Sequence, residues 1–136
     1  LCGILIFSCF YNFFSVNPLY LFFLMSFIFI LGWYFIFTYV QKNNTHDPSE
    51  IIIDEFLGQI LTLTPLLFLK NLKMNLDYFL ELVIFAFLLF RFFDIVKPWP
   101  INIIDRSKSS LSIMMDDIVA GLFSAVIVFI SLLWLQ

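Results

Sequence analysis

Acidic and basic side chains gather in three short stretches of a chain that is otherwise apolar. Two pairs of adjacent acids, Asp54–Glu55 and Asp116–Asp117, each lie near one end of a hydrophobic segment. The third stretch, residues 91–106, carries acids and cations between two hydrophobic segments. Charges this close to apolar segments are costly unless they pair, bind a ligand or face water. We therefore take these three stretches as the candidate functional residues.

Carboxylates combined with cations suit the chemistry of phosphate. Hard cations such as Mg²⁺ prefer carboxylate oxygens and retain positions for a substrate phosphate. Arginine offers a planar fork to phosphate oxygens, and lysine offers a point charge. A bound metal polarises the phosphoryl oxygen and activates water. The residue types therefore predict a metal-assisted site that acts on phosphate.

The composition is that of an integral membrane protein. Of the 136 residues, 62% are hydrophobic and 12% are charged, which is about half the charged share of a soluble domain. We expect an all-α membrane helical bundle of about four to five helices, built as a single domain over residues 1–136. Because the chain begins at Leu1 without an initiator Met, we also expect that it lacks its N-terminal segment. The net charge of -3 gives no basic cluster for nucleic acid.

The hydrophobic segments predict how the chain crosses the bilayer. Residues 19–40 carry no charge and exceed the roughly 20 residues that a transmembrane helix needs. Alternating crossings then place the three charged stretches on one membrane face. Most Lys and Arg residues lie on that face, which makes it cytoplasmic by the positive-inside rule. The other expected elements are helices over residues 48–69 (kinked at Pro65), 78–93 and 113–135, and a loop or short interfacial segment over 101–111.

Two helix faces are predicted to point into the bundle. In the 48–69 helix the polar and small side chains fall within one arc of the helical wheel. In the last helix the small side chains share one face, which permits close helix packing. The first face consists of Asp54, Glu55, Gly58 and Thr62, and the second of Asp117, Ala120, Gly121, Ser124 and Ala125.

Two alternatives to a phosphate site remain open at this point. The charges can be ordinary ion pairs, with Arg91 bound to Asp94 one turn away and Asp105 and Arg106 solvated. The chain can also be a membrane ion transporter or channel with an acid-lined path. A transporter predicts acids spread through the membrane depth and inverted repeats, whereas here the charges gather at one face and no repeat is found. The oligomeric state stays open.

Three ordered segments resemble the phosphatidylglycerophosphatase A family. Residues 46–58 are similar to its "H-D-x-x-x-I-V-x-D-E-x-x-G" segment, and residues 90–106 to its "F-R-x-x-D-x-x-K-P-W-P-I…D-R" block. Residues 113–121 are similar to its "I-M-x-D-D-x-x-A-G" block. The family's N-terminal glycine- and proline-rich block has no counterpart here, as expected for a chain that lacks its N-terminal segment.

The resemblance implies a Mg²⁺-dependent phosphatase of the bacterial inner (cytoplasmic) membrane, with its site facing the cytoplasm. Its substrate would be the lipid phosphatidylglycerophosphate, hydrolysed to phosphatidylglycerol and phosphate in phospholipid synthesis. We expect direct attack by water in preference to an aspartyl-phosphate intermediate, since no Ser or Cys nucleophile stands at a telling position. Asp94 would orient Arg91 or assist proton transfer. The expected metal ligands are Asp54, Glu55, Asp116 and Asp117; the catalytic acids are Asp54, Glu55, Asp94 and Asp117; and the phosphate-binding residues are Arg91, Lys97 and Arg106.

Overall fold

The computed structural model of the chain describes residues 18–43, 52–71, 76–107 and 109–134. These residues form helices joined by turns and contain no strand, which confirms the predicted all-α fold. The elements are α2 (Pro18–Asn43), α3 (Ile53–Leu63), the 3-10 helix η1 (Thr64–Asn71), α4 (Leu76–Val96), α5 (Ile101–Arg106) and α6 (Ser110–Trp134).

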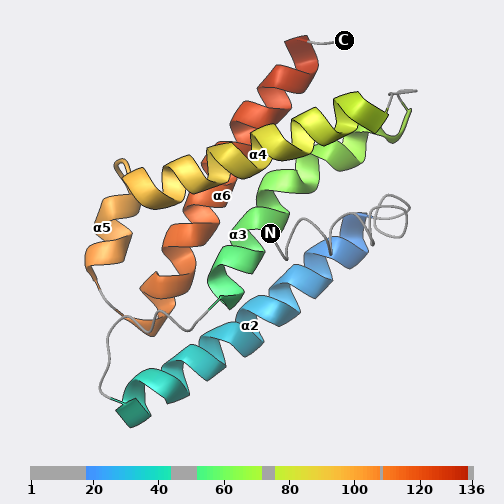
Figure 1. Cartoon of the computed structure of the whole chain (residues 1–136). Coiled ribbons are helices and arrows are strands. Elements are labelled where there is room, and N and C mark those ends of the chain that lie inside the picture. Colours follow the sequence, from blue (N-terminus) through green and yellow to red (C-terminus); the bar gives the residue numbers. More distant parts are fainter. Residues whose placement is uncertain (1–17, 44–51, 72–75, 108, 135–136) are drawn as a thin grey trace.

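Helix α6 is the centre of the bundle. It contacts every other described element, and its contact with α3 is the most extensive in this part of the chain. The first residues of α3 and α6 and the last residues of α2 and α4 lie toward the left side of the view in Figure 1, as does α5. The acids at the start of α3 and α6 and the charges at the end of α4 are therefore brought to the same end.

Two of the described helices are long and apolar enough to cross a membrane: α2 over Leu19–Lys42 and α6 over Ser110–Trp134. Most side chains of α2 are exposed, including those of Phe22, Phe23 and Phe27. An exposed apolar surface of this kind suits contact with lipid rather than water. The α-helical part of α3 has 11 residues and reaches only about 16 Å, so membrane crossings beyond these two stay predictions.

The structure refines three of the predicted elements. The expected 48–69 helix is α-helical only from Ile53 to Leu63 and continues as a 3-10 helix from Thr64, next to Pro65. Proline removes a backbone donor and clashes with the preceding turn, which explains why the α-helix ends there. Residues 48–51 lie outside the described ranges. Helix α4 runs on to Val96, and residues 101–106 form the short helix α5 where a loop or short interfacial segment was expected.

The backbones of α3 and α6 meet at two glycines. A Cβ atom on Gly121 would lie 2.5 Å from the Gly58 carbonyl oxygen, and a Cβ on Gly58 would lie 2.6 Å from the Asp117 carbonyl oxygen. The fully buried Thr62 hydroxyl donates to the Gly58 carbonyl oxygen at 2.9 Å and lies 3.3 Å from that of Gly121. Only glycine allows this approach, because any side chain would occupy the space of the opposite backbone.

The two helix faces predicted to point inward are largely confirmed. Asp54, Gly58 and Thr62 are buried in α3, whereas Glu55 at the edge of the same face is half-buried. All members of the small-residue face of α6 are buried: Asp117, Ala120, Gly121, Ser124 and Ala125.

Replacing Gly121 with Ala is expected to destabilise the fold by about 1–3 kcal/mol, since the added methyl group overpacks a backbone contact. The measurement is the free energy of unfolding in detergent. Gly32→Ala is the matched control, because a Cβ on Gly32 would meet only the ends of the Met114 and Ile53 side chains, at 3.0 Å and 3.1 Å. Equal losses in the two variants would contradict the proposed backbone contact.

Candidate active site

The glycine contact sets the positions of two buried acids. Asp54 lies four residues before Gly58, and Asp117 lies four residues before Gly121, so each acid is one helical turn from the contact. Their side chains are enclosed, with 8% of Asp54 and 5% of Asp117 exposed. The Asp117 carboxyl lies close enough to Asp94, Asp54 and Asp116 to interact with them electrostatically. Three helices thus contribute carboxyl groups to one small region.

Arg91 on α4 pairs with two acids, Glu55 on α3 and Asp94 on its own helix. Its Nη2 lies 2.7 Å from Oε2 of Glu55, and its Nη1 lies 3.0 Å from Oδ2 of Asp94. The expected pair with Asp94 one turn away therefore forms, but Arg91 also binds an acid on a separate helix. These side chains are partly exposed, so the pairs fix the position of the guanidinium group more than they stabilise the fold.

Lys97 makes a second bridge, between α5 and α6. Its Nζ lies 2.7 Å from Oδ2 of the buried Asp116 and also donates to Oδ1 of Asp105. Burial favours the neutral amine, but the hydrogen bonds to the two carboxylates outweigh it and raise the pKa of Lys97 above its usual value. Lys97 is therefore held as a cation.

The backbone of Lys97 is in the left-handed region, with φ of 44°. This residue directly follows α4, and its amide donates to the Phe93 carbonyl oxygen at 2.9 Å. Glycine is the usual residue at such a helix end, because a side chain there costs about 1 kcal/mol. A lysine kept in this conformation indicates that its side-chain bonds hold it in place.

The carboxylates outnumber the cations that pair with them. Within the described residues neither Asp54 nor Asp117 takes part in an ion pair. Asp54 accepts a hydrogen bond of 2.9 Å from the Glu55 amide in the first turn of α3, where the helix dipole favours negative charge. Oδ1 of Asp116 is buried and has no hydrogen-bond partner among the described residues. A divalent cation would offset this excess of negative charge.

The four predicted metal ligands fit Mg²⁺ by their chemistry, since the carboxylates of Asp54, Glu55, Asp116 and Asp117 are hard oxygen donors. In their present arrangement two of these acids are ion-paired and two are not. In the part of the chain that the structure describes, no three acidic, His or Cys side chains are placed as a metal-binding group. Arg91 holds Glu55 and Lys97 holds Asp116. Metal binding by these residues stays a prediction.

Most of the predicted site residues come together in the structure, and Arg106 is the exception. Arg106 is exposed at the end of α5 and belongs to none of the ion pairs in the described ranges. Asp105, which the ion-pair alternative placed in solvent beside Arg106, instead binds Lys97. No pattern in the sequence indicated that pair beyond the place of both residues in the 91–106 stretch. His46 and Asp47 lie outside the described residues.

An all-helical bundle with two apolar spans and a cluster of acids and cations at one end defines a membrane protein with a candidate phosphate site. The chain belongs to the phosphatidylglycerophosphatase A family, whose model matches residues 1–132. This confirms the resemblance seen in the sequence. No solved structure matches the chain.

Three relatives with curated names are similar to the chain. The phosphatidylglycerophosphatase A of Haemophilus influenzae is 32% identical over 108 residues, which cover 79% of this chain and 61% of the relative. The phosphatidylglycerophosphatase A of Escherichia coli is 37% identical over 100 residues, which cover 73% of this chain and 53% of the relative. A Bacteroides thetaiotaomicron protein carries a provisional phosphatidylinositol-3-phosphatase name. It is 39% identical over 82 residues, which cover 60% of this chain and 47% of the relative. The chain thus spans about half to three-fifths of the length of these relatives.

Removing the Lys97 cation should leave Asp116 as an unpaired buried charge. Lys97→Met is expected to lower the free energy of unfolding by about 1–3 kcal/mol. Adding Asp116→Asn should restore most of this loss, whereas adding Asp105→Asn should restore little, because Asp105 is exposed. Denaturant unfolding of the single and double variants measures both effects. If Asp116→Asn only adds to the loss, the assigned pairing is wrong.

Proposed function

We propose that this protein hydrolyses the terminal phosphate monoester of phosphatidylglycerophosphate, giving phosphatidylglycerol and phosphate. The observation that carries the proposal is the cluster of acids and cations at one end of an apolar bundle. The buried Asp54 and Asp117 are the sequence neighbours of Glu55 and Asp116, which pair with Arg91 and Lys97. Membership of the family supports the same reaction. The pairs with Arg91 and Lys97 gather at this end rather than along the bundle, which favours a surface site over an ion path.

The two cations can hold a phosphate group without leaving their acids. An ammonium group has three N–H donors, and Lys97 uses two of them on Asp105 and Asp116. A guanidinium group has five, and Arg91 uses two on Glu55 and Asp94. The remaining donors would bind the phosphate oxygens and stabilise the charge that develops during hydrolysis. Arg106 would add a further cation from the end of α5.

In the proposed reaction, water attacks the phosphorus atom and the bond from phosphorus to the glycerol oxygen breaks. The buried Asp117, one helical turn from the glycine contact, would accept a proton from the attacking water. The departing glycerol oxygen takes up a proton, so that the products are the lipid alcohol and inorganic phosphate. Asp94 also fixes the guanidinium group of Arg91, which would orient the phosphate for in-line attack.

Mg²⁺ is the proposed cofactor, and Asp54, Glu55, Asp116 and Asp117 would hold it. The excess of carboxylates and the unpartnered Oδ1 of Asp116 support this assignment. When bound, the ion would supply polarisation of the phosphoryl oxygen and activation of water. Glu55 and Asp116 would then share their negative charge between the ion and the cations that they bind in this structure.

The two apolar spans and the family together indicate a membrane protein. We further propose that it lies in the bacterial inner membrane with the charged end at the cytoplasmic face. Arg91, Lys97 and Arg106 lie at that end, as does Lys42 in the last turn of α2. This distribution agrees with the positive-inside rule. The lipid substrate would then reach the site from the inner leaflet.

The proposal is tested by phosphate release from phosphatidylglycerophosphate in detergent, with Mg²⁺ and with EDTA. Asp54→Asn and Asp117→Asn should each lower kcat by about 100-fold or more, because each removes a charged group from the reacting centre. Asp77→Asn, at an exposed acid in the first turn of α4, is the matched control and should keep full activity. EDTA should abolish release.

A parallel assay with phosphatidylinositol 3-phosphate would show which lipid phosphate monoester is preferred. Release that persists in EDTA would overturn the metal assignment. No release of either phosphate from a folded sample would overturn the phosphatase proposal, and ion flux in liposomes would then test the transporter alternative.

A further inference from the structure

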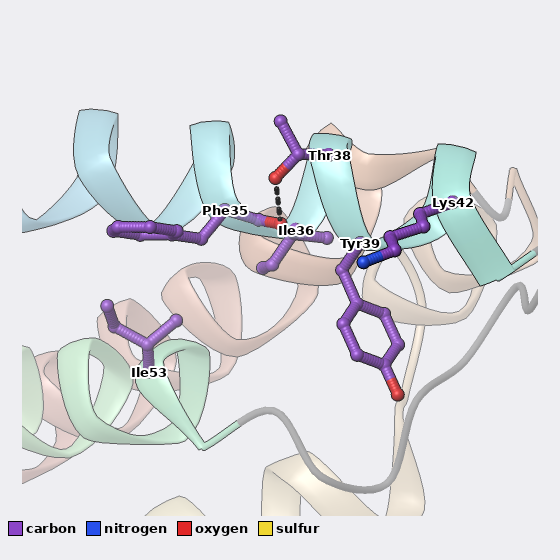
Figure 2. Close-up of a pocket in the computed structure, with 6 residues that line it drawn as sticks. All are labelled: Phe35, Ile36, Thr38, Tyr39, Lys42 and Ile53. Carbon is purple, nitrogen blue, oxygen red and sulfur yellow. Dashed lines mark hydrogen bonds between the residues drawn. The ribbon is translucent and has the colours of Figure 1, made fainter.

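A pocket of about 320 Å³ lies between the last turns of α2 and the start of α3, toward the same end of the bundle as the charged cluster. Its volume is within the range of about 300–1,000 Å³ that is usual for small-molecule sites. Its lining consists of Phe35, Ile36, Thr38, Tyr39 and Lys42 from α2 and Ile53 from α3 (Figure 2).

The walls of this pocket are mainly apolar. Ile36 and Ile53 point toward one another across it in Figure 2, and Phe35 lies at one end. The Thr38 hydroxyl is already bonded to the Phe35 carbonyl oxygen at 2.9 Å, so it does not make the walls more polar. A flexible hydrocarbon chain matches such a surface, whereas a polar ligand would lose its hydration without compensation.

A cation stands at the other end of the pocket. Figure 2 shows the Lys42 ammonium group near Tyr39, away from Phe35. Lys42 is the last residue of the candidate membrane span Leu19–Lys42, which places it at the level of the lipid headgroups. Lysines at this level extend toward the interface and attract anionic lipid phosphates.

The pocket is also next to the candidate active site. Ile53, which lines the pocket, directly precedes the buried Asp54, and their Cα atoms are only about 3.8 Å apart. A phospholipid with two phosphates could therefore place one at Lys42 and the other at the charged cluster. Phosphatidylglycerophosphate has these two groups, a phosphodiester near its acyl chains and a terminal monoester.

We propose that the pocket between α2 and α3 is the binding site for an acyl chain of the substrate lipid, with the lipid's phosphodiester at Lys42. This inference rests on the proposed lipid phosphatase function and adds how the lipid is held. The apolar walls bind the chain, Lys42 fixes the depth of the headgroup, and the terminal phosphate is left for Arg91 and Lys97.

The first test compares KM and kcat for the diacyl substrate with those for its acyl-free headgroup, glycerophosphoglycerophosphate. Phe35→Ala should raise KM for the diacyl lipid about tenfold. This corresponds to losing roughly half the binding free energy that full burial of one Phe side chain supplies. It should leave kcat and the acyl-free substrate unchanged. Phe22→Ala is the matched control, because Phe22 is on the same helix and equally exposed (64%, against 61% for Phe35) but lies outside the pocket.

The role of Lys42 is tested by substitutions that remove or keep its positive charge. Lys42→Gln should raise KM for the diacyl lipid about fivefold, which corresponds to the attraction of one interfacial lysine for an anionic phosphate. Lys42→Arg should restore the original KM, because it keeps the charge at the same helix end. Hydrolysis with unchanged KM in both Phe35→Ala and Lys42→Gln would overturn the proposed binding site.

The second test does not depend on activity. Phosphatidylglycerol with a photoreactive acyl chain is crosslinked to the Asp54→Asn protein, and the labelled residues are mapped. Labelling should concentrate between Phe35 and Lys42 and fall in Phe35→Ala. Labelling spread evenly along α2 would show only surrounding lipid and would overturn the inference. Concentrated labelling without hydrolysis by the unmodified protein would contradict the phosphatase function but not the lipid site.

Discussion

The charged site depends on how closely the backbones of α3 and α6 approach each other. At Gly58 and Gly121 the two helices touch without side chains between them, and the Thr62 hydroxyl closes the contact. Asp54 and Asp117 are each one turn from this point, so the spacing of the backbones determines the spacing of the carboxyl groups. Acids buried this close repel each other, and the packing of the two helices must offset that repulsion.

The two cations link separate helices, and Arg91 also pairs with Asp94 within α4. Arg91 joins α4 to α3, and Lys97 joins α5 to α6, so that the four helices around the site are linked at one end by side-chain bonds. Each cation keeps unused donors. A site built this way holds its cations in place before a ligand arrives, which lowers the entropy that phosphate binding must overcome.

Helical periodicity made much of this architecture predictable. The spacing of Asp54, Gly58 and Thr62 indicated an inward face, as did the small residues around Gly121, and both faces are buried. What the periodicity could not supply was the geometry between elements. The change to a 3-10 helix at Thr64 depends on the missing amide donor and the ring of Pro65. The pairing of Asp105 with Lys97 depends on α5, whose 6 residues are too few to show a helical period.

The change of helix type in the α3–η1 segment also affects its reach. An α-helix rises about 1.5 Å per residue and a 3-10 helix about 2.0 Å. The 11 residues of α3 and the 8 of η1 therefore have a combined contour of about 32 Å. The hydrocarbon core of a bilayer is about 30 Å thick. By stretching its second half, this segment attains the length of a full membrane crossing with fewer residues than an α-helix would require.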